Sequence, residues 1–302
     1  MNHGRDAGFF YATFSRLMRR AGPGLVMAAA LLPVAPPAGG EQAMSLTFGI
    51  VPQQSASRLA RDWSPLLQEL GEILGTVVQF RTTADIPTFE ACLAGGAFDV
   101  AYMNPYHYVV YSENPGYRAV AHQSNHTLMG IMVVRTDSPY RTIDDLEGLQ
   151  VAFPSPAAFG ASILTRAEMR ARDVSFTPRY VKSHDSVYRA VSSGLMPAGG
   201  GVSRTLQAAD PAIRDQLRVI HVTREYTPHA IAVRPGLDSA TVERVKEALL
   251  AVHDRNVEAL ERIAFEDIEL ADDGDWDDVR ALGITESEAG LAVAGESTCP
   301  FD

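Results

Sequence analysis

Hydrophobic and polar residues follow two different periods along the chain from residue 46 onward. Short apolar runs typical of β-strands occur at 46–51, 77–80 and 98–103. Between them, apolar residues recur at helical spacing over 58–74 and 86–94, and a glycine follows each of these helices. Strands that alternate with helices predict a mostly parallel, doubly wound α/β sheet.

The alternation restarts after a strand at 129–135, which indicates a second α/β lobe. The pattern there predicts strands at 150–153, 176–181 and 218–222, a helix ending at 171 and a helix at 186–193. A strand at 229–233 and one long amphipathic helix over 239–264 then predict a return to the first lobe. We expect two crossings with a cleft at the hinge, and the following division: lobe one at 44–135 and 228–284, lobe two at 136–227, and a loosely ordered tail at 285–302.

The first residues have the pattern of a secretory signal peptide. Three arginines at 16–20 precede an apolar run at 25–34, and small residues follow. The run is shorter than the roughly 20 apolar residues that a membrane span needs. We predict that residues 1–43 are removed on export, with cleavage between 38 and 43; a mis-assigned start, with the true one at Met44, is the alternative.

The charge and the cysteines narrow the classes of protein. The formal net charge of -11 argues against binding to nucleic acid or to anionic lipid. It leaves room for a small anion, because backbone N–H groups can hold one inside an acidic protein. Cys92 and Cys299 could pair in an exported protein, but Cys92 falls on a helix and Cys299 in the tail, so unpaired cysteines are favoured.

The segment Asp99–Tyr108 joins a short strand to a helix and carries several polar and aromatic groups. Pro105 suits the first turn of a helix, and Asn104 stands at the N-cap position. In an open α/β sheet the ligand binds at the carboxyl ends of the strands, where such helix starts present free N–H donors. Tyr102, Asn104 and Tyr106 are therefore candidate ligand-binding residues.

Other strand ends are predicted to face the same cleft. The small residues at 155–162 would let a ligand approach the backbone closely, and His184 could donate to an oxyanion while Ser183 or Asp185 caps its helix. Structural alternatives remain open: His229 as a buried structural histidine, His126 as a surface residue, and the glycines at 199–201 as a flexible turn. The further candidates are Gln53, Gln54, Ser55, Ala158, Phe159, Gly160, His184, Asp185 and Tyr226, with weaker ones at 199–203 and 226–229.

Motifs for catalysis are missing from the sequence. It contains no Gly-x-Ser-x-Gly elbow, no P-loop and no His-Glu-x-x-His pair. The two cysteines do not have metal-site spacing. We expect no catalytic residue, no metal site and no cofactor.

Four motifs taken together resemble the periplasmic phosphate-, phosphite- and phosphonate-binding proteins of ABC importers, the PhnD-like family. They lie at 48–52, 96–108, 142–153 and 183–194, and the resemblance runs from about Leu46 to Ile284. It implies a type II periplasmic binding fold, with two Rossmann-like lobes that close on the ligand by hinge bending, and no catalysis. It also implies a periplasmic monomer that binds a small oxyanion or phosphonate-type ligand and delivers it to an ABC permease. A sensing partner of a membrane histidine kinase, or an enzyme on the same fold, is the alternative.

The resemblance also implies roles for residues, with two departures. Tyr102 or Tyr106, together with His184, match positions that touch the ligand oxyanion in relatives. Relatives usually have Ser-Thr-Ser-Gly where this chain has 158–161, so here only backbone donors remain. Relatives also tend to carry an acidic residue within the stretch that corresponds to 194–201, which has none here. That loss weakens the case for an aminoalkylphosphonate and leaves phosphite, phosphate or another small molecule as ligand.

Overall fold

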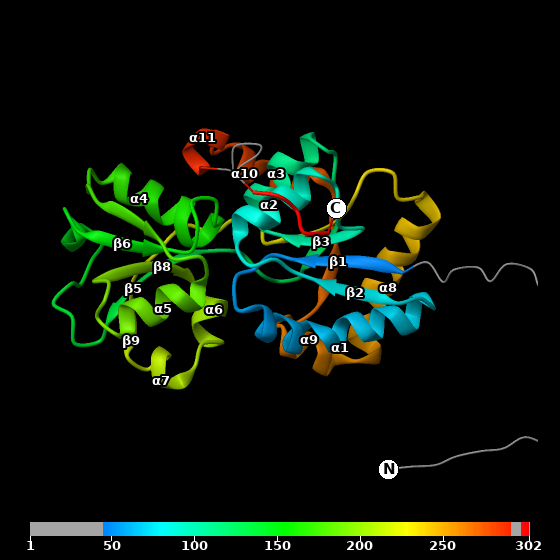
Figure 1. The fold of residues 1–302 in the computed structure, drawn as a ribbon, viewed down its shortest axis with the longest axis horizontal. Coiled ribbons are helices and arrows are strands. Elements are labelled where there is room, and N and C mark those ends of the chain that lie inside the picture. The colour runs from blue at the N-terminus through cyan, green and yellow to red at the C-terminus, as the bar shows by residue number, and fades with distance from the viewer. Residues whose placement is uncertain (1–44, 291–296, 302) are drawn as a thin grey trace, which may run out of the picture. The chain divides into compact units, whose positions relative to one another are not determined.

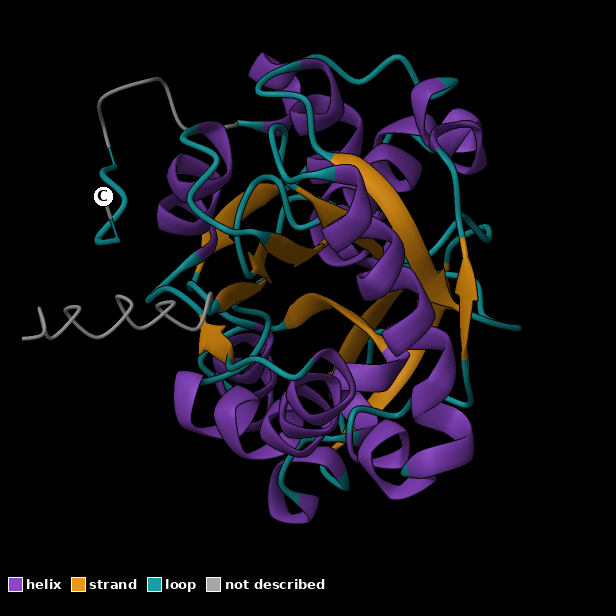
Figure 2. Cartoon of the chain, turned by 90° about the vertical axis from the view of Figure 1, so that its right-hand side faces the viewer, coloured by secondary structure: helices purple, strands orange, loops and turns teal. Residues whose placement is uncertain are grey.

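The computed structural model describes residues 45–290 and 297–301. The predicted signal peptide and its cleavage site lie outside these residues. The described chain forms two mixed β-sheets that helices cover (Figures 1 and 2). In this part of the chain no helix is long and apolar enough to cross a membrane.

The first sheet has the strand order β11-β4-β10-β3-β1-β2. β1 is parallel to β2 and β3, as the alternation predicts, but β10 runs antiparallel between β3 and β4, and β11 is antiparallel to β4. The sheet is therefore mixed, because the returning strand enters from the opposite direction. Its strands are β1 (Leu46–Ile50), β2 (Val78–Arg81), β3 (Val100–Met103), β4 (Arg118–Gln123), β10 (Ala230–Val233) and β11 (Ile268–Leu270).

Helices cover the first sheet on both sides (Figure 1). The predicted helix over 239–264 is broken at Asn256, whose side chain accepts from the Ala259 N–H and caps a second helix. The helices are α1 (Ala56–Leu74), α2 (Ile86–Ala94), α3 (Pro105–Glu113), α8 (Ser239–Arg255) and α9 (Val257–Arg262), followed by η3 (Asp273–Trp276), α10 (Asp277–Arg280) and α11 (Glu286–Ala289).

The second sheet has the order β7-β6-β8-β5-β9. β5, which the sequence assigned to lobe one, pairs antiparallel with β8 and β9 of this sheet. The first crossing therefore precedes β5, since an apolar run does not reveal which sheet will hold it. The strands are β5 (Gly130–Arg135), β6 (Gln150–Phe153), β7 (Thr177–Tyr180), β8 (Ala198–Val202) and β9 (Leu217–Val222).

Opposite faces of the second sheet carry separate hydrophobic cores. Ile131 and Val133 of β5 pack with α5, whereas Met132 and Val134 pack with Met169 of α4. This alternation is the two-residue period of a strand buried on both faces. The helical elements are η1 (Asp144–Leu146), the π-helix η2 (Phe159–Leu164), α4 (Thr165–Ala171), α5 (His184–Ser192), α6 (Ser203–Gln207) and α7 (Pro211–Arg214).

The glycine run is a buried central strand, so the flexible-turn interpretation is wrong. Residues of β8 from Ala198 to Val202 are all buried. A Cβ atom at Gly200 would lie 1.9 Å from the carbonyl oxygen of Ala161, and one at Gly201 would lie 2.3 Å from the hydroxyl of Tyr188. The missing side chains let η2 and α5 lie directly against the strand.

The chain passes between the sheets at 124–129 and at 223–229. The two segments are joined by reciprocal backbone hydrogen bonds between Leu128 and Tyr226, of 2.7 and 3.0 Å. This paired crossover is the hinge that the sequence led us to expect.

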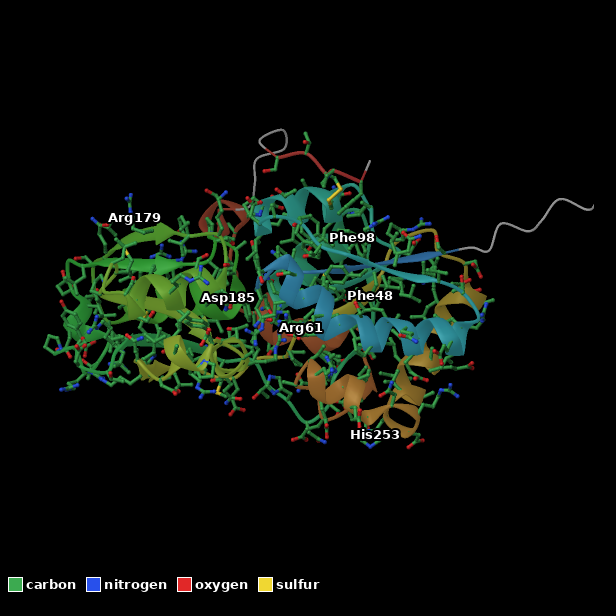
Figure 3. The ribbon with its side chains drawn as sticks, turned by 60° about the horizontal axis from the view of Figure 1, so that its bottom comes forward. Phe48, Arg61, Phe98, Arg179, Asp185 and His253 are labelled. Carbon is green, nitrogen blue, oxygen red and sulfur yellow. A yellow bond between two sulfur atoms is a disulfide. The ribbon has the colours of Figure 1, made fainter. Side chains whose placement is uncertain are left out.

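A disulfide joins Cys92 of α2 to Cys299, so the prediction of unpaired cysteines is wrong (Figure 3). The two residues are 207 positions apart, but their Cα atoms lie 4.7 Å apart. Nothing local in either segment signals this proximity. Parts of the tail are also structured: residues 286–289 form α11, and the Phe301 ring lies 5.9 Å from that of Phe98.

Candidate ligand-binding site

Two adjoining cavities lie where elements of the two sheets meet. Their volumes are about 10 and 40 Å³, and Val202 and His229 line both. A cavity needs a volume of roughly 10–15 Å³ to hold a single water molecule. A ligand of several heavy atoms therefore fits only if the residues that line the two cavities move apart. Both sheets contribute walls, and motion at the paired crossover would widen the space between them.

Three helical segments begin at the smaller cavity. Asn104 precedes α3, Ala158 precedes η2, and His184 is the first residue of α5; all three line the cavity. Helix starts leave backbone N–H groups without intrahelical acceptors and carry a positive partial charge. The His107 and His184 N–H groups already have acceptors, Asn104 Oδ1 and the Gln53 carbonyl, but the positive ends of the three segments still make the cavity suited to an anion.

Asn104 connects the two sheets. Its Oδ1 accepts from the His107 N–H at 2.8 Å, and its Nδ2 donates to the Ala157 carbonyl at 3.0 Å. The His107 ring is fully buried next to this helix start, and its Nε2 lies 3.1 Å from Oε1 of Glu90 on α2. The predicted N-cap role of Asn104 is confirmed, and its amide also reaches the other side of the cleft.

Gln53 and Arg204 form a second link across the cleft. Arg204 Nη2 donates to Gln53 Oε1 at 2.5 Å and to the Tyr102 hydroxyl at 3.4 Å. This bond orients the Gln53 amide, whose Nε2 then donates to Nε2 of His229 at 2.9 Å. His229 must accept at Nε2 and is therefore neutral, and its ring stacks on Tyr102 at 4.9 Å.

His184 is held from two directions. Its backbone N–H donates to the Gln53 carbonyl at 2.9 Å, across the cleft, and its Nδ1 shares a 2.9 Å hydrogen bond with the Thr205 hydroxyl. Burial, with a smaller contribution from Arg204, lowers the pKa of His184 to about 3. The ring is therefore neutral at physiological pH.

Arg204 is the one formal charge among the residues that line the two cavities. Burial is the main cause that lowers the pKa of His229 and of the half-buried His126, and the positive charge of Arg204 adds to both shifts. An acidic protein thus presents a locally positive site lined with neutral donors.

Ser55 and Asp185 meet at the rim of the site. The Ser55 N–H donates to Asp185 Oδ2 at 3.3 Å, a contact between the start of α1 and the start of α5. Neither residue lines a cavity. Their contact joins the two sides of the cleft.

Most of the predicted residues lie at the cleft, but the side chains of Gln54, Tyr106 and Tyr226 do not line either cavity. Gln54 is buried, and its Nε2 has no hydrogen-bond partner in the described chain. The Tyr106 hydroxyl donates to the Ile284 carbonyl, and Tyr226 packs edge-on behind Phe159 at 5.6 Å.

Among the cavity-lining residues that sequence reasoning missed, two are basic or titratable. Arg204 was not singled out, although it follows the glycine-rich segment that was a weaker candidate. His126, expected at the surface, is partly buried in the first crossover and lines the larger cavity. A basic residue directly after a buried strand end was the available signal for Arg204.

Two serines flank the start of η2 with unused hydroxyls. Ser155 and Ser162 are buried, and their Oγ atoms have no hydrogen-bond partner among the described residues. Buried polar groups are nearly always satisfied in proteins, so such hydroxyls mark a place of functional interest. Neither serine is among the residues that line the two cavities.

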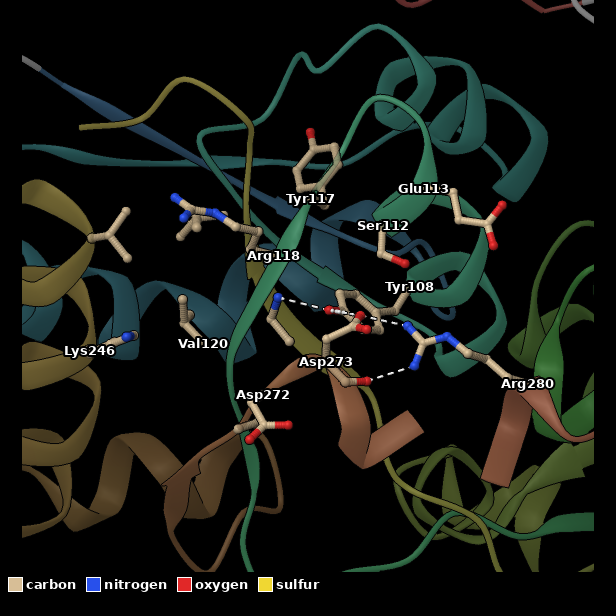
Figure 4. Close-up of a pocket in the computed structure, with 14 residues that line it drawn as sticks. Tyr108, Ser112, Glu113, Tyr117, Arg118, Val120, Lys246, Asp272, Asp273 and Arg280 are labelled. Carbon is tan, nitrogen blue, oxygen red and sulfur yellow. Dashed lines mark hydrogen bonds and ion pairs between the residues drawn. The ribbon is translucent and has the colours of Figure 1, made fainter. Parts of the chain in front are cut away.

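A larger hollow of about 560 Å³ lies outside the cleft, against the first sheet (Figure 4). Three of its polar side chains bond to one another: Asp273 accepts from the Tyr108 hydroxyl at 2.8 Å and from Arg280 at 2.5 Å. These groups stabilise the packing of η3 and α10 on α3. Within residues 45–290 and 297–301, no group of three or more His, Cys, Asp or Glu is placed to hold a metal ion.

Two lobes joined by a paired crossover, with a polar site between them, define the class of the periplasmic binding proteins. Residues 48–276 match the family model described as ABC transporter, phosphonate, periplasmic substrate-binding protein, so the chain belongs to this family. The predicted role in solute binding, and not in catalysis, is thereby confirmed. The predicted membership in a family of periplasmic proteins is confirmed as well. Nothing in these comparisons favours a sensor kinase as partner.

Solved structures share the fold over most of the chain. A binding protein of an ABC phosphonate transporter from Pseudomonas aeruginosa has a TM-score of 0.74 at 14% identity, over 83% of this chain and 89% of that one. PhnD1 from Prochlorococcus marinus, in complex with methylphosphonate, has a TM-score of 0.72 at 16% identity, over 79% and 97%. A Xanthomonas citri protein bound to a chloride ion has 0.63 at 18%, over 82% and 97%. These similarities confirm the type II binding-protein fold.

Proposed function

We propose that this protein captures a phosphonate or a closely related small oxyanion in the cleft and delivers it to an ABC importer. The observation that carries the proposal is the convergence of three helix starts, at Asn104, Ala158 and His184, on one cavity beside Arg204. Family membership and the methylphosphonate complex of PhnD1 support the same ligand class.

The contacts between the lobes suggest how a ligand is enclosed. Gln53, Asn104 and Arg204 already bridge the cleft by hydrogen bonds to the opposite lobe. An oxyanion that enters between the lobes would accept from donors on both sides. It would therefore bind the closed arrangement more tightly than an open one, which is what drives hinge closure.

We further propose that the protein works as an exported monomer. Residues 1–43 would direct it to the periplasm and be removed there, which leaves a chain that begins near the first strand.

A thermal-shift panel of methylphosphonate, phosphite, phosphate and sulfate tests the ligand class. Ligand at about 100 times its dissociation constant adds roughly 2.7 kcal/mol of stability, a readily measured rise in Tm. We expect at least one of the phosphorus oxyanions to raise Tm and sulfate to raise it less. If none of the phosphorus oxyanions raises Tm and no other phosphonate binds, the proposed function is wrong.

A variant pair tests the location. His184→Ala is expected to weaken binding of the active ligand at least tenfold while the circular dichroism spectrum of the free protein is retained. His253→Ala is the matched control, because His253 is half-exposed on α8 and lies away from the cleft (Figure 3). Equal affinity of the two variants would remove His184 from the site.

A further inference from the structure

The two cavities of the cleft differ in charge. Helix starts line the smaller one, which contains no lysine or arginine. The larger one contains Arg204 and the partly buried His126, and Val202 and His229 form the boundary that both share. With the phosphonate group at the helix starts, an organic substituent directed past this boundary would reach toward Arg204.

Arg204 has side-chain N–H groups that form no hydrogen bond within the described residues. Both of its hydrogen bonds, to Gln53 and to Tyr102, use Nη2, while Nε and Nη1 have no acceptor in the described part of the chain. A guanidinium with free donors binds a carboxylate by two parallel hydrogen bonds, and charged acceptors form stronger bonds than the neutral amide of Gln53. The side chain is only partly buried, so a ligand group can reach it.

No acidic side chain lines either cavity. Asp185, at the rim, accepts from the Ser55 backbone and is not among the lining residues. Glu266 acts electrostatically on His126 but does not line the larger cavity. An ammonium group there would therefore have no carboxylate in the lining and would lie beside a guanidinium of like charge. The neutral His229, which already accepts from Gln53, offers it no compensating charge.

We propose, resting on the function proposed above, that the cleft selects short phosphonates whose substituent ends in a carboxylate and rejects aminoalkylphosphonates. The phosphonate oxygens are held at the starts of α3, η2 and α5, and the carboxylate is held by Arg204. The two cavities share Val202 and His229 in their linings, so we expect a short substituent to connect them.

Three probes of similar length test this selectivity by isothermal titration calorimetry at 0.15 M salt. Phosphonoacetate carries a carboxylate, 2-aminoethylphosphonate an ammonium and ethylphosphonate neither. We expect phosphonoacetate to bind at least tenfold more tightly than ethylphosphonate, and 2-aminoethylphosphonate at least tenfold more weakly. Malonate, which lacks the phosphonate group, should not bind detectably.

The outcomes separate the two proposals. If ethylphosphonate binds but phosphonoacetate is no tighter, or 2-aminoethylphosphonate binds as well, the selectivity inference is wrong and the proposed function stands. If none of the three phosphonates binds, and none of the oxyanions of the thermal-shift panel does, the proposed function itself fails.

Variants of Arg204 test the residue. In Arg204→Met, the affinity ratio of phosphonoacetate to ethylphosphonate should fall to near one, and Arg204→Glu should reverse the preference toward 2-aminoethylphosphonate. Arg179→Met is the matched control, because Arg179 lies exposed on the edge strand β7, at the far end of the second lobe (Figure 3). A ratio that stays at the wild-type value in Arg204→Met would overturn the assignment. The wild-type ratios keep the inference testable if a variant does not fold.

Discussion

Replacing Gly200 by alanine tests the packing on which the site is built. A Cβ atom at this position would lie 1.9 Å from the carbonyl oxygen of Ala161, whereas ordinary contact begins at 3.4 Å, so β8 and η2 would have to separate by about 1.5 Å. The opposing atom belongs to the backbone and cannot rotate away. Overpacking of this kind costs about 1–3 kcal/mol, and the rigid partner places Gly200→Ala at about 3 kcal/mol.

Urea unfolding and thermal denaturation measure the effect. A loss of about 3 kcal/mol lowers Tm by about 6 °C or more for a protein of this size. Gly274→Ala is the control, since the nearest atom there is the carboxylate oxygen of Asp272 at 3.3 Å, and a surface change of this kind stays within about 0.5 kcal/mol. The displaced η2 also carries Phe159 and Gly160, so ligand affinity should fall with stability. A Gly200→Ala protein as stable as Gly274→Ala would refute the close packing.

Cys299→Ser should lower the free energy of unfolding by about 2–4 kcal/mol under oxidising conditions, because the link to Cys92 restricts the unfolded chain over 207 positions; an unchanged urea midpoint would contradict this role. Burial, with Arg204 as a second cause, lowers the pKa of His184 to about 3. The same two causes also lower the pKa of His229. The unfolded chain therefore binds protons that the folded protein excludes, and stability should fall by about 1.4 kcal/mol per pH unit for each histidine as the pH drops below about 6. His184→Gln should make the free energy of unfolding, measured in urea, about 1.4 kcal/mol per pH unit less dependent on pH. An unchanged pH dependence would count against the burial of His184 as a neutral ring. Mass spectrometry of the exported protein should find an N-terminus between residues 38 and 43; an intact first segment would exclude the predicted processing.

Much of the fold could be predicted because burial periodicity is local. The expected strands at 46–51 and 150–153 and the helix at 86–94 agree with the structure within a residue or two. β4 was not predicted, because its sequence of small and polar residues, Arg118–Gln123, lacks the bulky alternation of a typical strand. The sheet that receives β5 and the partner of Cys92 depend on contacts between distant segments, which no local pattern encodes.

The site was predictable where function coincides with a helix start. Asn104 and His184 stand at strand-to-helix junctions, and the structure places both at the cleft. Arg204 also follows a strand end, which was the available signal, but the sequence does not show that the side chain of this basic residue reaches the cleft. Tyr106 shows the opposite error: the right segment contains it, but helical geometry directs its hydroxyl to Ile284 instead of the cleft.

Hydrogen exchange with saturating methylphosphonate tests most directly whether the ligand lies between the lobes. We expect the ligand to slow exchange in both lobes: in peptides that cover residues 102–108 of the first lobe, and in peptides that cover 157–162 and 183–188 of the second. These segments line or border the cavities. Exchange should stay unchanged around the hollow near Asp273. Protection confined to one lobe, or to that hollow, would contradict a phosphonate site in the cleft.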